Sequence, residues 1–459
     1  MVSSWADGNS FYAVGREGVV GQQVQAQADG SLKITDSSNL SPLFAGIIKY
    51  VPAPSCQDGA AMLQVSNLDF DDYKGAYAIG KITQGTLSKG QTLHLLRAGE
   101  NGEVKKITTG KVEFLFEFKG LGKNPVDKAI CGDIVALTGF ADIKISDTLT
   151  ASDDLTLLPP IKISEPTIQV QFLVSTSPFV GKEGEFNTSR QLKARLEKEL
   201  ERNVGLRLSP GESSESFLVS GRGELHLAIL MENMRREGYE FSVGRPEVIF
   251  KTNKSGQQLE PWEALSIEVP EDLVGAVTTA MGERKAVFKN MRNLKLGVRF
   301  EYEISSRNLI GFRSEFQTTT SGLGIVNSVF LEYRPVGEPM AWHRGGVFIA
   351  ASSGNALAYD LKRLEERGVA FVTPGTPLYA GMIVGENSKK EDIVINLCKG
   401  KKLTNVRSNA DILIRLSPIR QFSLEQALAY LGKDELLEIT PKSIRLRKRD
   451  LHVASAYRS

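Results

Sequence analysis

The order of predicted strands and helices repeats once along this chain, and this repeat constrains the fold more than any other feature. Between 167 and 243, apolar alternation and helical periodicity predict a strand, a helix, two strands, a helix and a strand. In the first helix Leu192, Leu196 and Leu200 are four apart and share one face. The same order recurs between 264 and 333 without identity of sequence. Each stretch therefore predicts a ferredoxin-like βαββαβ domain.

The rest of the 459 residues must form further domains, because the chain is too long for two such units alone. Short alternating segments without helices precede a proline-rich linker and predict a small β-barrel. The expected fold class is multidomain α+β, with a small β-barrel, two ferredoxin-like βαββαβ domains and a mixed α/β C-terminal domain. The expected boundaries are a lead-in at 1–43, the barrel at 44–158, ferredoxin-like domains at 159–252 and 253–335, and the C-terminal domain at 336–459. The second ferredoxin-like domain has a helix predicted at 307–319, and Ser423 with Gln426 predicts a capping box in the C-terminal domain.

Composition excludes several classes of protein. No apolar run approaches the roughly 18–20 residues that cross a bilayer, and the first residues carry no secretory pattern. Three cysteines, Cys56, Cys131 and Cys398, lie far apart, which argues against a disulfide framework or a zinc site and for a reducing compartment. We therefore expect a monomer in the bacterial cytoplasm, or in an organelle matrix if the source is eukaryotic, with no membrane partner and no metal site.

The nucleotide-binding signals are incomplete. Gly75 to Lys81 fits the spacing of a phosphate-binding loop, but Ile82 stands where a hydroxyl would hold magnesium, and the stretch alternates like a strand. Gly221 and Gly223 supply two of the three glycines of a dinucleotide fingerprint, which favours a strand-to-helix turn. His226, just beyond, is interpreted as a packed or capping histidine. From the residues alone we expect no catalytic group and no cofactor.

One pair of aromatic residues has two interpretations. Phe300 and Tyr302 alternate on a predicted strand and so resemble base-stacking residues of an RNA-binding sheet. Val298 and Ile304 lie on the same face, which favours a role in the core.

The C-terminal part of the chain is strongly basic. From Lys399 to Arg449 there are 12 Lys or Arg and 5 Asp or Glu, a local charge of 12 − 5 = +7 in a chain whose net charge is +2. Such clustering is typical of proteins that contact the phosphates of nucleic acids. A merely solvated surface is the alternative interpretation. Ser443 to Arg449 is predicted as a strand whose alternation puts Arg445 and Arg447 on one face. The candidate RNA-binding residues are Lys399, Lys401, Lys402, Thr404, Asn405, Arg407, Arg420, Arg445, Arg447, Lys448 and Arg449.

Several stretches resemble the BipA/TypA family of ribosome-associated translational GTPases. The likeness runs from about Pro42 to Leu451. Elongation factor G and LepA share the barrel and the ferredoxin-like units, whereas the Gly-Lys-Lys-Leu-Thr-Asn run is similar to TypA alone. The stretches that carry the resemblance are Thr176–Gly184, Val219–Ile249, Ser306–Phe316, Lys399–Arg407 and Ile444–Leu451.

The resemblance implies a ribosome-binding arm with many partners. Family members contact rRNA, A-site tRNA and ribosomal proteins, and they are linked to stress-dependent translation and large-subunit assembly. The ferredoxin-like units would then match domains III and V of elongation factor G. Lys399, Lys401, Lys402 and Arg407 would match the loop that approaches tRNA and rRNA.

The sequence departs from the family at its start. Phe11 to Gly15 resembles only the last guanine-contacting motif, so the lead-in is interpreted as the end of a GTPase domain that is otherwise missing. We therefore expect that this chain alone is not an enzyme, and that GTP and magnesium are bound only if a GTPase domain is supplied elsewhere. The alternatives are a GTPase half in a separate or missing chain, or a protein-interaction module with an acidic partner.

Overall fold

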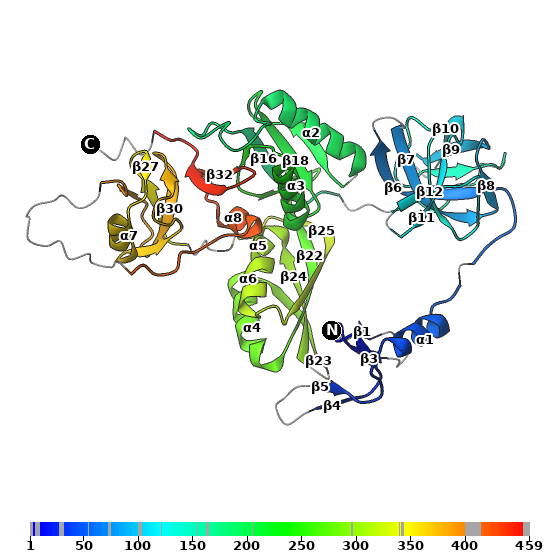
Figure 1. Ribbon diagram of the computed structural model, residues 1–459, viewed down its shortest axis with the longest axis horizontal. Coiled ribbons are helices and arrows are strands. Elements are labelled where there is room, and N and C mark those ends of the chain that lie inside the picture. Colours follow the sequence, from blue (N-terminus) through cyan, green and yellow to red (C-terminus); the bar gives the residue numbers. More distant parts are fainter. Residues whose placement is uncertain are drawn as a thin grey trace, which may run out of the picture. The chain divides into compact units, whose positions relative to one another are not determined.

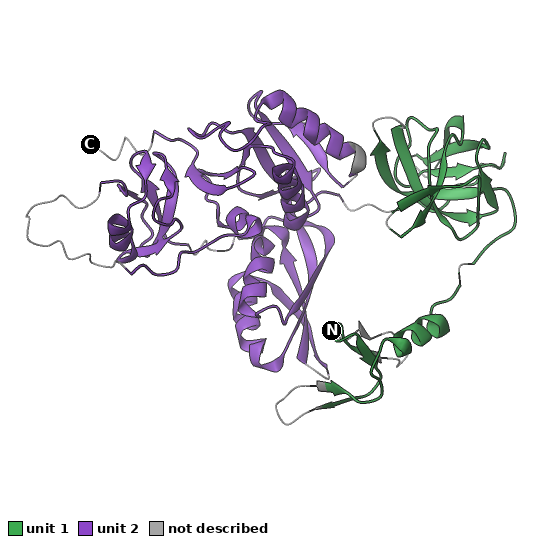
Figure 2. Cartoon of the chain, viewed as in Figure 1, with its two compact units in different colours: residues 1–161 green, residues 162–459 purple. Residues whose placement is uncertain are grey.

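The structure is a computed structural model that divides into two compact units, residues 1–161 and 162–459 (Figure 2). Each unit has its own apolar core, and each is described by itself. No helix among the described residues is long and apolar enough to span a bilayer. The residues that the structure describes are 3–4, 10–26, 32–53, 55–71, 75–99, 103–120, 122–153, 155–161, 165–203, 205–294, 297–338, 340, 344–399 and 415–452.

Unit 1 begins with short strands and one helix. Strands β1 (Ser3–Ser4), β2 (Ser10–Val14) and β3 (Val19–Gly21) form an antiparallel sheet, and β4 (Val24–Ala26) pairs with β5 (Leu32–Ile34). Helix α1 (Ser41–Tyr50) has proline in its first turn, where the missing N–H costs nothing, and Lys49 in its last turn.

The rest of unit 1 is an antiparallel sheet of eight strands in the order β10-β9-β15-β6-β7-β14-β11-β12, which curls around a buried apolar core (Figure 1). Gly75 to Gln84 forms strand β7, so the strand interpretation of the phosphate-loop-like stretch is confirmed. Strands β8 (Thr86–Ser88) and β13 (Lys128–Ile130) form a separate pair. The sheet strands are β6 (Met62–Asp71), β7 (Gly75–Gln84), β9 (Thr92–Ala98), β10 (Val104–Lys111), β11 (Leu115–Lys119), β12 (Gly122–Pro125), β14 (Ile134–Leu137) and β15 (Thr148–Thr150).

Unit 2 contains the first ferredoxin-like fold as predicted. Its four strands are ordered β17-β18-β16-β19, and helices α2 and α3 lie together against the sheet (Figure 1). Thr188 and Gln191 form a capping box at the start of α2. The elements are β16 (Ile168–Val174), α2 (Ser189–Arg202), β17 (Arg207–Pro210), β18 (Ser216–Gly221), α3 (Glu224–Arg236), β19 (Phe241–Val243), and β20 (Glu247–Val248), which also pairs with β16.

The second ferredoxin-like fold has strand order β25-β22-β24-β23, with short β21 beside β22. Phe300 and Tyr302 are buried in its core, which confirms the core interpretation. The helix predicted at 307–319 is broken at Gly311, whose φ is 77°. The elements are β21 (Lys251–Thr252), β22 (Gln258–Val269), η1 (Glu271–Leu273), α4 (Val274–Glu283), β23 (Val287–Leu294), β24 (Gly297–Ser305), α5 (Ser306–Leu309), α6 (Phe312–Thr319) and β25 (Ile325–Pro335).

The C-terminal region forms a four-stranded sheet, ordered β28-β30-β26-β31, with helix α7 beside it. Helix α8 starts at Ser423 with Gln426 completing the predicted capping box. The elements are β26 (Val347–Ala350), β27 (Gly354–Asn355), α7 (Ala358–Glu365), β28 (Gly368–Ala370), β29 (Pro377–Leu378), β30 (Ile383–Asn387), β31 (Ile393–Ile395), α8 (Leu424–Tyr430), β32 (Glu435–Ile439) and β33 (Ile444–Lys448).

The last hairpin belongs to a different sheet from the rest of that region. Strand β32 pairs with β19, placing Ile439 opposite Phe241, and β33 pairs with β32, so the hairpin widens the first ferredoxin-like sheet. Leu437, Ile439 and Leu428 share one buried core with Phe172 of β16. The expected boundary at 336 implied a separate C-terminal domain. In the structure, the end of that region completes the sheet that begins at Ile168, so the region is not self-contained.

Candidate nucleic-acid interface

A cleft of about 590 Å³ lies where the C-terminal region meets the first ferredoxin-like fold. Four cations line it: Arg235 from α3, Arg420 before α8, and Lys442 and Arg445 around the start of β33. Among the residues that the structure describes, no carboxylate lines this cleft. Cations without interleaved carboxylates present a positive field, which is the property that phosphate groups recognise. We call this feature the cationic cleft.

Aromatic rings and hydrogen-bonding side chains accompany the four cations. Phe371 and Phe422 line the cleft and meet edge to face, with ring centroids 4.9 Å apart. The guanidinium of Arg420 lies over the ring of Phe422 at 4.8 Å from its centroid. Thr373, Thr376, Gln421 and Ser443 complete the polar part of the lining. Aromatic and guanidinium planes beside cations are the groups on which bases of single-stranded RNA stack.

The four cations differ in how strongly their charges are compensated. Arg420 is half exposed and its Nη1 atom donates to Glu386 at 2.7 Å. Lys442 is exposed, and no ion pair or hydrogen bond joins its side chain to another described residue. Arg235 pairs with Glu232 at 3.0 Å and donates from Nε to the carbonyl of Thr440. Lys442 is therefore the least compensated charge of the cationic cleft, with Arg420 next.

Arg445 is largely committed to internal contacts. Its guanidinium is 10% exposed, pairs with Glu183, and donates to Glu438 at 3.1 Å. Burial opposes ionisation of Glu183, but hydrogen bonds from Thr440 and the charge of Arg445 outweigh it and lower the pKa of the Glu183 carboxyl. Arg445 thus lines the cleft while most of its charge is neutralised by the protein itself.

The other cations of β33 do not face solvent. Arg447 is 1% exposed, donates from Nη2 to Thr176 at 2.8 Å, and has a pKa lowered by burial. Lys448 is 3% exposed and contacts Asp392 and Asp434 at 2.7 Å each. Burial lowers the pKa of Lys448, but the hydrogen bonds with Asp392 and Asp434 raise it by more, so its pKa lies above the ordinary value. These two residues are not the free cationic stripe that the alternation of the strand suggested.

The remaining predicted residues fall into two groups. Arg449 is exposed and donates to the amide oxygen of Gln171 at 3.2 Å, and Lys399, the last residue of the described range 344–399, is also exposed. Lys401, Lys402, Thr404, Asn405 and Arg407 lie outside the described residues.

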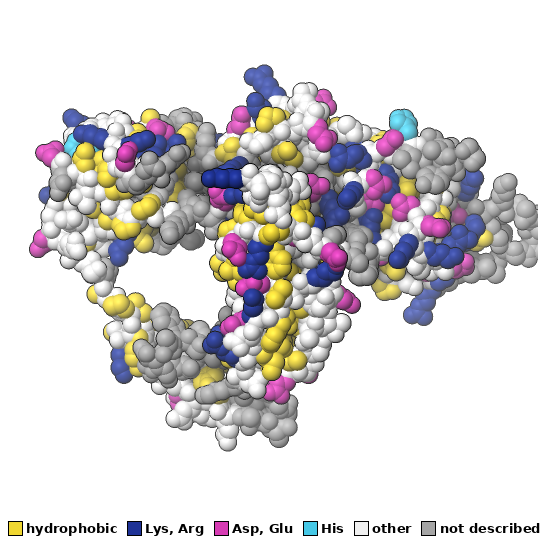
Figure 3. Space-filling model, turned by 180° about the vertical axis from the view of Figure 1, so that it is seen from behind, with side chains coloured by type: hydrophobic (Ala, Val, Ile, Leu, Met, Phe, Trp, Pro, Cys, Tyr) yellow, Lys and Arg dark blue, Asp and Glu magenta, His cyan; other side chains and the backbone are white. Residues whose placement is uncertain are grey.

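Four cationic or aromatic residues of the cleft lining, Arg235, Phe371, Phe422 and Lys442, were not among the candidates from the sequence. Arg235 lies in the last turn of a helix, 164 residues before the start of the basic region (399 − 235), and Phe371 and Phe422 look like ordinary core residues in the sequence. Lys442 carried a signal, because it directly precedes the predicted basic strand. In Figure 3, Lys and Arg side chains on unit 2 are interspersed with Asp and Glu, so charge density alone does not locate the cleft on the surface shown.

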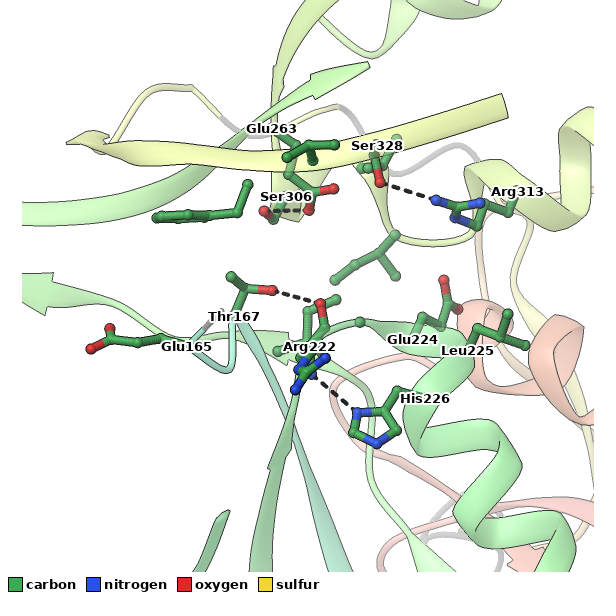
Figure 4. Close-up of a pocket in the computed structure, with 16 residues that line it drawn as sticks. Glu165, Thr167, Arg222, Glu224, Leu225, His226, Glu263, Ser306, Arg313 and Ser328 are labelled. Carbon is green, nitrogen blue, oxygen red and sulfur yellow. Dashed lines mark hydrogen bonds between the residues drawn. The ribbon is translucent and has the colours of Figure 1, made fainter. Parts of the chain in front are cut away.

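The glycine-bounded turn Gly221–Gly223 opens onto a second pocket of about 490 Å³ within unit 2 (Figure 4). On one side Arg222 and His226 lie together, and the ring Nδ1 of His226 accepts the backbone N–H of Arg222 at 3.4 Å. The other ring nitrogen meets Asn203 at 2.7 Å. Burial and the charge of Arg222 lower the pKa of His226. His226 is half-buried and contacts neighbours through both ring nitrogens, which agrees with the interpretation of a packed or capping histidine.

The opposite wall of that pocket comes from the second ferredoxin-like fold. Arg313 donates to Ser328 at 3.0 Å, and Ser306 donates to Glu263 at 2.7 Å (Figure 4). These polar groups satisfy one another's hydrogen-bonding capacity. Among the described residues no group of His, Cys, Asp and Glu side chains has the arrangement of a metal site.

Three family models match parts of the chain. The TypA/BipA C-terminal domain matches residues 345–453, the elongation factor G C-terminus matches 257–342, and elongation factor Tu domain 2 matches 75–150. These ranges correspond to the C-terminal region, the second ferredoxin-like fold and the barrel.

Curated relatives match most of the chain. The "large ribosomal subunit assembly factor BipA" of Synechocystis is 48% identical over 90% of this chain and 69% of its own length. Proteins with the same name are 42% identical in Salmonella typhimurium, over 96% of this chain and 71% of theirs, and 42% identical in Bacillus subtilis, over 90% and 67%. A solved Thermus thermophilus chain aligns with a TM-score of 0.42 at 16% identity, covering 65% of this chain and 59% of that one, which is too distant to inform the fold.

These matches correct one expectation drawn from the sequence. We expected that this chain alone is not an enzyme, because the sequence holds neither a complete P-loop nor a guanine-reading motif. The relatives match 90–96% of the chain at 42–48% identity, and the family they represent is the GTP-hydrolysing one that the sequence resembles. The expectation is therefore wrong. The chain spans 67–71% of the relatives' own length.

Proposed function

Because the chain belongs to the TypA/BipA family, we propose that it is a ribosome-associated translational GTPase that acts in assembly of the large ribosomal subunit. The ribosome is its partner, and the protein works wherever ribosomes are assembled, in the cytoplasm or an organelle matrix. GTP and magnesium are its cofactors in this proposal.

The observation that supports the proposal most strongly is the cationic cleft. Its four cations, two phenylalanines and absence of lining carboxylates among the described residues match the needs of a ribose-phosphate chain with accessible bases. We propose that Arg420 and Lys442 contact phosphates of rRNA or of A-site tRNA. We propose Lys399, Lys401, Lys402, Thr404, Asn405, Arg407 and Arg449 as further residues that contact RNA.

Ribosome association should depend steeply on salt. If about six phosphates are neutralised, affinity falls roughly 10³-fold between about 50 and 200 mM salt. Sedimentation of the protein with purified large subunits over a salt series measures this slope. A flat response would refute binding through phosphates.

Variants of the cleft separate it from the rest of the surface. We expect Arg420→Ala combined with Lys442→Ala to weaken co-sedimentation and to reduce the salt slope by about one unit per lost contact. Lys433→Ala is the matched control, because Lys433 is exposed in the same region but does not line the cleft. Equal binding by the double variant and the control would contradict the assignment of the cleft.

The GTPase part of the proposal has its own measurement. We expect hydrolysis of GTP by the protein to rise when ribosomes are added, and to need magnesium. No hydrolysis above background under either condition would refute this part while leaving RNA binding standing.

An acidic protein partner is the alternative occupant of the cleft. Nuclease treatment of a complex recovered with the tagged protein distinguishes the two, because an RNA partner is lost and an acidic protein is retained.

A further inference from the structure

Two thiols meet on the surface of the barrel in unit 1. Cys56 lies in the segment between α1 and β6, and Cys131 lies in the turn between β13 and β14. Cys131 is close enough to Cys56 to be the largest influence on the pKa of its thiol. Cys56 is exposed and Cys131 is half-buried. The two residues are 75 positions apart in sequence (131 − 56), so their contact is produced by the fold and not by local spacing.

The position of Cys56 is set by its neighbours. Gln57 forms a parallel bridge with Gln84 at the end of β7, and the N–H of Gly85 donates to the Gln57 carbonyl at 3.2 Å. The amide of Gln84 donates to the carbonyl of Asp58 at 3.1 Å. Gly85 has φ 69°, and a Cβ there would lie 2.4 Å from the carbonyl oxygen of Gly59. The segment that carries Cys56 is therefore held directly against β7.

Cys131 is held at the same end of the same strand. Its Sγ donates to the carbonyl of Thr83 at 3.2 Å, and the next residue, Gly132, donates its N–H to the carbonyl of Ile82 at 2.8 Å. Thr83 directly precedes Gln84, and Gln84 pairs with Gln57, the residue that follows Cys56. Both cysteines are thus held beside adjacent residues of one strand, and this proximity is the first requirement for a disulfide between them.

We propose that Cys56 and Cys131 form a reversible disulfide when the protein meets an oxidised thiol compound or an oxidised dithiol protein. The exposed Cys56 thiolate attacks the external disulfide and releases one thiolate of the oxidant. The Cys131 thiolate then attacks the sulfur of Cys56 in this mixed disulfide and releases the second. The pair loses two protons and two electrons, and the external disulfide is reduced to two thiols.

The environment of Cys56 favours slow exchange. The neighbouring Cys131 raises the pKa of the Cys56 thiol, desolvation raises it further, and the charge of Lys81 only partly offsets both. A raised pKa leaves less thiolate at neutral pH, so the rate should climb as the pH rises through the thiol range. The bond would tie the segment that follows α1 to the barrel, and would form only under oxidising conditions in a compartment that otherwise keeps thiols reduced.

The test uses the full chain equilibrated with mixtures of reduced and oxidised glutathione, followed by trapping of free thiols and peptide mass spectrometry. We expect a cross-linked pair of peptides that contain Cys56 and Cys131, lighter by two hydrogens, which disappears after reduction. Cys398 should remain trapped as a free thiol in the cross-linked protein. Cross-link formation should also become faster with increasing pH.

Two variants serve as controls. Cys398→Ser should keep the cross-link, and Cys131→Ser should abolish it and leave Cys56 as a mixed disulfide with glutathione. The wild-type result stands independently of whether Cys131→Ser folds. The proposal is overturned if the wild-type protein forms no cross-link at any glutathione ratio, whether both cysteines carry glutathione or neither does.

Discussion

Arg344 and Glu435 form a two-point ion pair, with Nη1 at 2.8 Å from Oε2 and Nη2 at 2.6 Å from Oε1. The Glu435 side chain is fully buried, and the guanidinium of Arg344 also lies over the ring of Tyr430 at 4.5 Å. Lys448 shares the same carboxylate at 3.1 Å. The pair therefore joins the start of the C-terminal region to the hairpin that widens the first ferredoxin-like sheet.

Removal of Arg344 should destabilise unit 2. Arg344→Ala leaves a buried carboxylate with Lys448 and the N–H of Gly432 as its remaining partners, and breaking a buried pair from one side costs about 3–5 kcal/mol of unfolding free energy. Urea denaturation measures the loss. Arg334→Ala is the matched control, because Arg334 also pairs with a carboxylate and lies over Trp262 but is 30% exposed, so its loss should be below about 1 kcal/mol. Similar losses for both variants would contradict this account.

The substitution Arg447→Met should leave ribosome binding unchanged, unlike the removal of a side chain that contacts RNA. The Nε and Nη1 atoms of Arg447 are buried and have no hydrogen-bond partner among the described residues. An apolar side chain of similar volume removes this desolvation cost, so the stability should change by no more than about 1 kcal/mol in either direction. Ribosome co-sedimentation should equal that of the wild type. A selective loss of binding with stability unchanged would show that Arg447 contacts RNA after all.

The carboxyl of Glu224 should make stability depend on pH. It accepts the N–H of Gly311 at 3.0 Å, and burial raises its pKa above the ordinary 4.5. A raised pKa in the folded state means that folding favours the protonated carboxyl. The contribution of Glu224 to the free energy of unfolding is therefore present below about pH 4.5 and is lost as the pH rises through the folded pKa.

Glu224→Gln keeps the acceptor and removes the titration. We expect the unfolding free energy of the variant to increase relative to that of the wild type as the pH rises from about 4 to 8, by about 1.4 kcal/mol for each unit of pKa shift. Glu197→Gln on the exposed face of α2 is the control and should track the wild type. A gap between Glu224→Gln and wild type that stays constant across this range would disprove the assignment.

Gly311→Ala should destabilise the break between α5 and α6. Gly311 has φ 77°, and an added Cβ would lie 2.9 Å from the Cβ of Ala429 on α8. The left-handed conformation alone costs an L-residue about 1–2 kcal/mol. Gly275→Ala is the control, because Gly275 lies in α4 with open space around it, and alanine there should stabilise by about 0.5–1 kcal/mol. Thermal unfolding of the two variants should therefore shift in opposite directions.

The two ferredoxin-like folds could be predicted because the patterns that indicate their helices and strands involve only residues close in sequence. The leucine spacing of α2, the capping residues of α8 and the apolar face of Phe300 each depend on neighbours within a few positions. The break at Gly311 was missed, since one glycine in a helical pattern does not reveal whether its φ is positive.

The role of the β33 cations could not be predicted in the same way. Alternation shows that Arg445 and Arg447 share a face of the strand, but the side chains that oppose them come from distant segments. Glu183 precedes Arg445 by 262 positions, and Thr176 precedes Arg447 by 271. Pairing at such separations leaves no local trace, so basic density in the sequence overstated how much charge is free. The cationic cleft was missed for the same reason, because Arg235 reaches it from another part of the chain.

The pairing of β32 with β19 also affects how the protein is made. Phe241 and Ile439 are partners across a gap of 198 residues (439 − 241), so the edge of the first sheet stays uncovered until nearly the whole chain has left the exit tunnel. An uncovered strand edge invites pairing with a second nascent chain. Growth conditions that slow elongation would prolong this exposure, and a chaperone bound to the nascent chain would protect it.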